Sequence, residues 1–194
     1  MNIKIPKAYK PGAEDIPNVI APAGLEIASN YIKIGDYYSK TFFVFTYPRY
    51  ISTGWFSPLV NLPEMMDISI FIHPMDTALA LRNLRKKVAQ VEAEISEKEE
   101  KGIVRDPVLE TAYQDIESLR DSLQQAREKL FEVGVYITIY GKNLEDLAKL
   151  ENNIVNLMES KLVYLKPALF KQKEGLTSVF PIGKDELDIK TPLN

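Results

Sequence analysis

The clearest pattern of apolar and polar positions lies between residues 76 and 130. Apolar residues recur there at alternating spacings of three and four, in two stretches that are interrupted near Gly102. The first stretch is Leu81, Leu84, Val88, Val91 and Ile95, and the second is Leu109, Ala112, Ile116, Leu119, Leu123, Ala126 and Leu130. Asp106 and Pro107 suit the N-cap and first turn of the second stretch. The pattern predicts an antiparallel helical hairpin whose arms have about 24 residues and extend about 36 Å each.

Five shorter segments are rich in aromatic and β-branched residues or alternate between apolar and polar positions, as strands do. They cover residues 31–34, 37–47, 67–73, 135–140 and 162–165. The pair Gly35 and Asp36 predicts a hairpin turn between the first two strands.

Two further helices are expected outside the hairpin. Residues 54–62 predict a short helix that has Ser57 at its N-cap and Pro58 at its first position. Asn143 is expected to cap a longer helix that carries Asp146 in its first turn. The buried stripe of this longer helix is predicted to contain Leu147, Leu150, Ile154 and Leu157.

The order of these elements predicts the fold class. From residue 37 onward, and with the hairpin set aside, the order is strand, helix, strand, strand, helix, strand, which is that of the split βαβ arrangement. We therefore expect an α+β fold, a ferredoxin-like split βαβ sheet with an antiparallel helical hairpin inserted at about residues 76–130. This domain is expected to span residues 25–170.

Two segments are expected to lie outside that domain. Residues 1–24 contain four prolines, which favour extended chain, and they predict a proline-rich N-terminal arm. Residues 171–194 are polar and predict an irregular C-terminal tail with one further strand at 177–180.

The composition of the 194 residues excludes several kinds of site. The chain has no cysteine and one histidine, so disulfides, thiol nucleophiles, zinc–thiolate sites and multi-histidine zinc sites are excluded. It has no glycine-rich phosphate loop and no serine flanked by the glycines of a nucleophile elbow. The histidine, His73, ends a strand and is expected to hydrogen-bond a local backbone group rather than to act as a base. We therefore expect no catalytic residue, metal or cofactor in this chain.

The charges on the hairpin are segregated along its length. Acidic residues crowd the tip at Glu92, Glu94, Glu97, Glu99 and Glu100, and we interpret them as a solvated surface. Basic residues gather at the opposite end, which we call the basic base: Arg82, Arg85, Lys86, Lys87, Arg127 and Lys129. The basic base is either an ordinary solvated surface or a contact for an acidic protein or anionic lipid. The net charge of −3 argues against a protein that wraps nucleic acid.

Three aromatic residues are expected on one face of the sheet. If Ile68, Ile70 and Ile72 pack under the helices, Phe71, Tyr136 and Tyr140 point to the other face. Aromatic residues on an open sheet suit either base stacking or a protein partner. The N-terminal arm or the C-terminal tail could also fold over them, and cover by protein is favoured over nucleic acid.

Several segments together resemble the N-terminal domain of the large ATPases of conjugative type IV secretion systems, the TraC/TrbE/CagE-type family. The resemblance runs from about Ile20 to the C-terminus. The segments that carry it are Lys40-Thr41-Phe42-Phe43-Val44-Phe45-Thr46-Tyr47-Pro48-Arg49-Tyr50, Gly54-Trp55-Phe56-Ser57-Pro58-Leu59, Asp67-Ile68-Ser69-Ile70-Phe71-Ile72-His73-Pro74, Glu100-Lys101-Gly102, Arg105-Asp106-Pro107 and Lys166-Pro167-Ala168-Leu169-Phe170.

The resemblance implies a domain that precedes a RecA-like motor and attaches it to the inner-membrane secretion complex. The partners would be inner-membrane subunits of that system, the motor domain and a further copy of the chain. The location would be the cytoplasmic face of the inner membrane. The sequence stops at Asn194 before any Walker motif, so ATP and Mg²⁺ are expected only in the motor, and the tail would lead toward it.

Two alternatives remain from the residues alone. One is a stand-alone ferredoxin-like module that binds nucleic acid, with Phe71, Tyr136 and Tyr140 stacking on bases and the basic base on phosphates. Its binding should weaken steeply with salt. The weaker alternative is an enzyme or ligand-sensing domain that uses His73.

Overall fold

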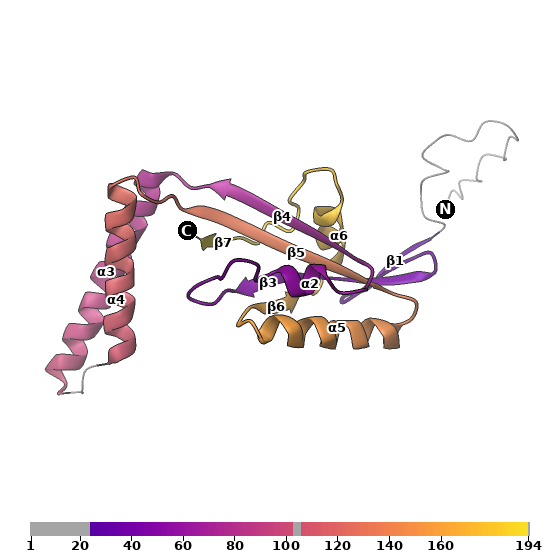
Figure 1. Cartoon of the computed structure of the whole chain (residues 1–194), viewed down its shortest axis with the longest axis horizontal. Coiled ribbons are helices and arrows are strands. Elements are labelled where there is room, and N and C mark those ends of the chain that lie inside the picture. Colours follow the sequence, from indigo (N-terminus) through magenta and orange to yellow (C-terminus); the bar gives the residue numbers. More distant parts are fainter. Residues whose placement is uncertain (1–23, 103–105, 194) are drawn as a thin grey trace, which may run out of the picture.

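A computed structural model describes residues 24–102 and 106–193, and so residues 1–23 of the expected arm lie outside the described part. Within this part the chain forms seven strands and five helices (Figure 1). The strands are β1 (Leu25–Ile27), β2 (Ile32–Ile34), β3 (Tyr37–Thr46), β4 (Met66–Pro74), β5 (Phe131–Gly141), β6 (Tyr164–Pro167) and β7 (Thr191–Leu193). The helices are α2 (Ser57–Val60), α3 (Thr77–Glu100), α4 (Pro107–Gln124), α5 (Leu144–Glu159) and α6 (Gln172–Val179).

The strands form one antiparallel sheet around β5. Its main order is β1-β2-β3-β5-β4, while β6 pairs with β3 and β7 pairs with β5. The four strands expected for the core of the fold therefore stand side by side as β6-β3-β5-β4. The turn at Gly35 and Asp36 joins β2 to β3 as expected, and Gly35 has a positive φ. Strands β1 and β7 carry no pattern that predicted them.

Helix α5 covers one face of the sheet. Asn143 caps it, with its Oδ1 atom accepting a hydrogen bond of 2.8 Å from the Asp146 N–H, as predicted. Leu147, Ile154 and Met158 are buried against the sheet beside Ile137 of β5. Each such side chain contributes about 1.5–3 kcal/mol by leaving water.

The short helix α2 packs on this same face through Leu59, but it begins one residue earlier than predicted. Phe56 is the N-cap and Ser57 is the first helical residue. The Ser57 N–H closes a turn onto the Gly54 carbonyl at 3.0 Å, so the turns that lead into the helix begin before Ser57, and no side chain caps α2.

Helix α6 and the chain that follows cover the opposite face, where an irregular tail was expected. The predicted strand at 177–180 is wrong, because residues 172–179 are helical. The spacing of Gln172, Leu176 and Val179 places all three toward the sheet, where they are buried. The β-branched residues Thr177 and Val179 favour a strand locally, and the gain from burying this helical face overrides that preference.

Gln172 completes the sheet at a gap in its hydrogen bonding. The outer edge of β3 pairs with β2 over residues 37–39 and with β6 from residue 42 onward, which leaves Thr41 between them. The Thr41 N–H donates to Gln172 Oε1 at 2.8 Å, and Gln172 Nε2 donates to the Thr41 carbonyl at 3.3 Å. The Thr41 carbonyl also accepts from the Ala168 N–H at 2.9 Å, so the side-chain amide replaces a strand neighbour as the acceptor for the Thr41 N–H.

Helices α3 and α4 pack against each other and extend away from one end of the sheet (Figure 1). The apolar residues predicted for the first arm are all half-buried or buried. The second arm is shorter than predicted, because α4 ends at Gln124 and Ala126 and Leu130 lie in the connection to β5. Ala126 has a φ of 53°, and its N–H bonds the Leu123 carbonyl while the Arg127 N–H bonds the Ser122 carbonyl. This is a Schellman motif, which ends a helix by turning the chain through the left-handed region.

Replacing Gln172 with alanine is expected to destabilise the fold by about 1–3 kcal/mol, because the buried Thr41 N–H loses its acceptor. Urea unfolding followed by circular dichroism measures this change. Gln114→Ala, at an exposed position of α4, is the matched control and should change stability by less than about 0.5 kcal/mol. Equal effects of the two substitutions would contradict the role given to Gln172.

Replacing Ala126 with glycine is expected to stabilise the fold by about 0.5–1 kcal/mol, because glycine adopts the positive φ of this position without strain. Ala89→Gly is the opposite control, since it lies exposed inside α3 and should cost about 1 kcal/mol. The same unfolding measurement should show opposite changes in the free energy of unfolding for the two variants. A loss of stability in both would rule out the strain at Ala126.

Candidate partner-binding surface

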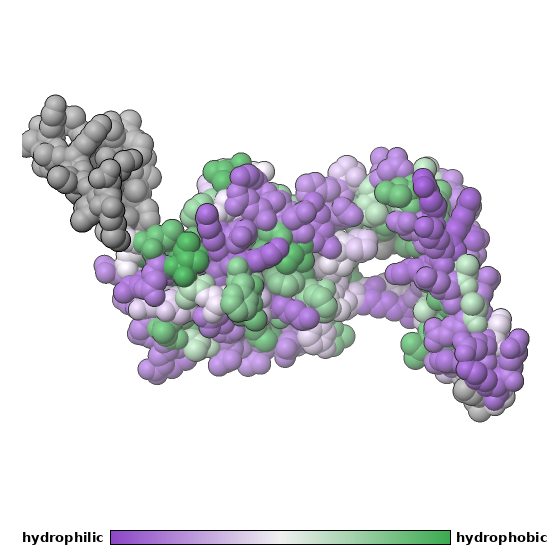
Figure 2. Space-filling model, turned by 180° about the vertical axis from the view of Figure 1, so that it is seen from behind, coloured by the Kyte–Doolittle hydropathy of each residue, from purple (hydrophilic) through white to green (hydrophobic). Residues whose placement is uncertain are grey.

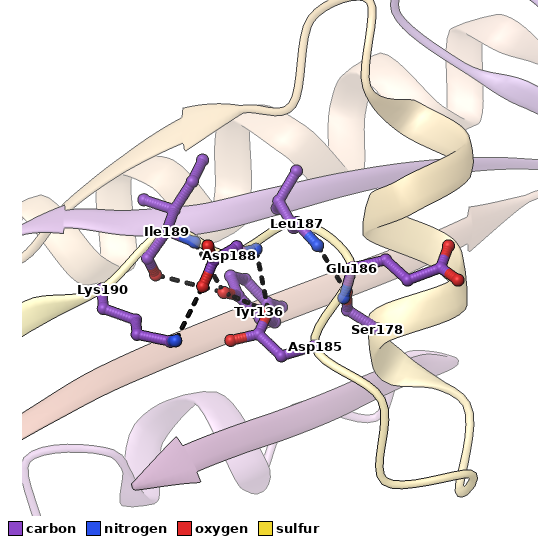
Figure 3. Close-up of polar contacts among 8 residues, drawn as sticks. All are labelled: Tyr136, Ser178, Asp185, Glu186, Leu187, Asp188, Ile189 and Lys190. Carbon is purple, nitrogen blue, oxygen red and sulfur yellow. Dashed lines mark hydrogen bonds and ion pairs between the residues drawn. The ribbon is translucent and has the colours of Figure 1, made fainter. Parts of the chain in front are cut away.

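The sheet face that carries Tyr136 is closed by the C-terminal segment. Tyr136 has an exposed fraction of 0%, beneath Leu176, Val179 and Leu187. Its hydroxyl donates to Asp185 Oδ1 at 2.7 Å and accepts from the Ile189 N–H at 3.0 Å (Figure 3). Burial, and then the bond to Asp185, raises the pKa of this hydroxyl above its ordinary range, so it remains a protonated donor.

A second hydroxyl holds the same segment from α6. Ser178 Oγ accepts from the backbone N–H groups of Glu186 and Leu187, at 2.9 and 3.0 Å, and donates to the Glu174 carbonyl at 2.8 Å. Figure 3 shows both hydroxyls aimed at the chain from Asp185 to Ile189. These bonds satisfy backbone groups in a segment that has no regular secondary structure of its own.

The partner-binding role predicted for Tyr136 is therefore wrong, since its ring and hydroxyl are used inside the fold. Phe71 is half-buried, and its ring centroid lies 5.8 Å from that of Tyr136. Tyr140 is also half-buried, and its hydroxyl donates to Asp67 Oδ2 at 2.6 Å. The three aromatic residues do not form an open platform on which bases could stack. The cover depends on Leu187 and Ile189, whose alternation with charged residues includes only two apolar positions and is too short to predict this cover.

Tyr140 borders a cleft at the end of the sheet away from the hairpin. The cleft has a volume of about 550 Å³ and lies between β5 and the first turns of α5. Its wall includes Tyr37, Met65 and Leu150 together with charges of both signs, such as Lys142 and Asp146. This mixture gives the cleft no preference for one charge of ligand.

The hydrogen bond expected between His73 and a local backbone group is not made through the Nε2 atom. That atom is buried and has no hydrogen-bond partner among the described residues. Within residues 24–102 and 106–193, no group of three or more histidine, cysteine, aspartate or glutamate side chains is placed to hold a metal ion.

The six residues of the basic base are all exposed. Arg82, Arg85, Lys86 and Lys87 project from the first half of α3, and Arg127 and Lys129 from the connection after α4. A hydrogen bond of 2.9 Å from the Met75 N–H to the Leu130 carbonyl ties the two ends of the hairpin together. In the part of the chain that the structure describes, none of the six forms a salt bridge.

The acidic tip is partly neutralised by its own helix. Lys98 bonds Glu94 and Asp106, Lys101 bonds Glu97, and the Tyr113 hydroxyl donates to Glu92 at 3.1 Å. The hydrogen bond from Lys98 lowers the pKa of the Asp106 carboxyl, which caps α4. The basic base therefore carries more unpaired charge than the tip does, and it lies where the hairpin meets the sheet.

Comparison with models of protein families gives no match, and comparison with curated proteins gives none. Among the described residues, no helix combines the length and apolarity needed to cross a membrane. The resemblance to type IV secretion ATPases therefore stays a prediction.

Replacing Tyr136 with phenylalanine is expected to lower the free energy of unfolding by about 1–3 kcal/mol, because it leaves Asp185 and the Ile189 N–H without this partner. Amide hydrogen exchange should also become faster at Ile189. Tyr50→Phe is the matched control, since Tyr50 is 77% exposed and its loss should matter little. Unchanged exchange at Ile189 would show that the hydroxyl does not hold the segment.

Proposed function

We propose that this chain is a non-catalytic docking and assembly domain of a conjugative type IV secretion ATPase, which attaches the motor to the inner-membrane secretion complex. The observation that carries the proposal is the exposed basic base, whose charges the described fold leaves unpaired. In the proposed protein, ATP and Mg²⁺ bind only to the motor, and the domain lies at the cytoplasmic face of the inner membrane.

The arrangement of strands supports the finer fold assignment that goes with this function. The side-by-side order β6-β3-β5-β4, all antiparallel, is the one expected for a ferredoxin-like split βαβ sheet. Helices α3 and α4 lie between β4 and β5 in the sequence, where the inserted hairpin was expected. We propose that the sheet is the rigid support and that the hairpin is the contacting element.

The charges suit docking better than catalysis or base stacking. Exposed cations raise association rates with an acidic partner and draw a domain toward an anionic membrane surface. The nucleic-acid alternative loses its main support, because Tyr136 is buried and cannot stack on a base.

Reversing Arg85, Lys86 and Lys87 to glutamate should weaken the binding of the chain to inner-membrane vesicles by at least about tenfold, since three exposed attractions become repulsions. Co-sedimentation with vesicles from cells that carry the secretion system measures the bound fraction. Vesicles from cells without that system and protein-free vesicles with phosphatidylglycerol separate binding to a subunit from binding to lipid.

The matched control reverses three other exposed lysines, Lys142, Lys161 and Lys173, and should bind as the unmodified chain does. Binding that survives reversal of the basic base, or that falls equally in both triple variants, would overturn the proposed contact. Equal binding to vesicles with and without the secretion system would overturn the proposed partner.

A further inference from the structure

The face of α3 turned away from α4 has a charge pattern that is complementary to itself. At 100° per residue, seven side chains fall on one side of the helix, opposite the apolar residues that pack on α4. They are Leu79, Arg82, Lys86, Ala89, Ala93, Glu97 and Glu100, and all seven are exposed. We call this set the outer face of α3.

The outer face is nearly symmetric about residue 91, with the sign of the charge reversed. Arg82 lies nine residues before this midpoint and Glu100 nine residues after it. Lys86 and Glu97 stand at nearly equal distances on the two sides, and Ala89 and Ala93 flank the centre. A second α3 laid antiparallel, with a twofold axis at residue 91, would therefore place Arg82 opposite Glu100 of the second copy and Lys86 opposite Glu97 of that copy.

These charges are unfavourable within one helix. Arg82 and Lys86 repel each other at a spacing of four residues. Glu97 and Glu100 lie in the last turn, at the negative end, and among the described residues only Glu97 has an ion-pair partner there, the exposed Lys101. An antiparallel second copy would replace these repulsions with attractions, because it brings the opposite charge and the opposite helix end beside each group.

The shape of the molecule leaves the outer face accessible. Helix α4 contacts the loop after β3, because Arg49 of that loop forms an ion pair with Asp115 of α4. Figure 1 shows α3 crossing behind α4, so that the later part of α3 lies on the side of the hairpin away from the sheet, and Figure 2 shows the hairpin surface as mostly hydrophilic. The central alanines allow two helix axes to approach to about 8 Å, the close end of helix packing.

We propose that two copies of this chain associate through the outer faces of α3, as an antiparallel and symmetric dimer. Such an isologous contact uses the same patch on both subunits and closes on itself, so it stops at two copies. The two charge pairs occur twice each, about 27 Å apart at their widest, with the alanines between them. This inference names a different partner from the proposed docking function, and Arg82 and Lys86 belong to both surfaces.

Charge-swap variants test the pairing. Sedimentation velocity at low salt should show the unmodified chain as a dimer. The double variant Arg82→Glu with Lys86→Glu should be a monomer, and so should the double variant Glu97→Lys with Glu100→Lys. Mixing the two double variants should restore a dimer, because each supplies the charge that the other lacks. Raising the salt concentration should dissociate both dimers, since exposed ion pairs are screened.

A cross-link tests the register. The chain has no cysteine, so Ala89→Cys with Ala93→Cys introduces the sole thiols, and oxidation should link two chains through residues 89 and 93. Gln114→Cys with Ser118→Cys has the same spacing on the exposed side of α4 and should not cross-link efficiently. A monomeric unmodified chain at low salt, a mixture that stays monomeric, or equal cross-linking of the two cysteine pairs would each overturn the proposal.

One variant distinguishes a failure of the proposed dimer from a failure of the proposed docking contact. Glu97→Lys with Glu100→Lys leaves the basic base intact, so it should lose the dimer and keep its binding to inner-membrane vesicles. Loss of both properties in this variant would show that the contact with vesicles needs two copies, whereas a lasting dimer would overturn the pairing itself.

Discussion

Strand β5 is apolar on both of its faces, and residues 135–139 are buried without interruption. A strand of this kind needs cover from two separate parts of the chain, because a single helix can cover one face only. Helix α5 supplies the cover on the side of Ile137, and α6 with the chain after it supplies the cover over Tyr136. Since β3, β4 and β7 all pair with β5, the position of every layer depends on this double burial.

Covering the second face brings irregular chain against a sheet, and its backbone groups then need partners. Two hydroxyls and one amide meet that need. Tyr136 and Ser178 bond the segment from Asp185 to Ile189, and Gln172 bonds Thr41 at the gap between β2 and β6. Unpaired polar groups in these buried places would cost about 1–3 kcal/mol each, so the three side chains decide whether the C-terminal segment can lie there.

Because both faces of the sheet are covered, the hairpin is the element whose exposed side chains remain available for a partner. Its apolar residues are used between α3 and α4, while its basic base and the outer face of α3 point to solvent. Among the described residues, the basic base forms no salt bridge and Glu97 is the one residue of the outer face that does, which is the reason that both proposals concern this element. Docking uses the excess of positive charge near the sheet, whereas pairing of two copies uses the balance between the two ends of α3.

The sequence by itself determined the elements that have a period or a cap. The heptad spacing located α3 and α4, the alternation of Ile68 with Ser69 located β4, and Asn143 located the start of α5. These signals are local, since each depends on side chains that repeat along one helix or strand. The basic base was likewise readable as a run of charges, and the structure places all six residues in solvent.

Only the tertiary structure decided what lies over Tyr136. Residues 172–179 have strand-forming residues yet form a helix, and Leu187 and Ile189 alternate with charged residues but belong to no strand. Burying these side chains stabilises the fold because they pack on an apolar face of the sheet. The hydroxyls of Tyr136 and Ser178 also bond the backbone of the segment that carries Leu187 and Ile189. Such contacts join residues about 40 to 50 positions apart or cross from a helix to a loop, so no local pattern could contain them.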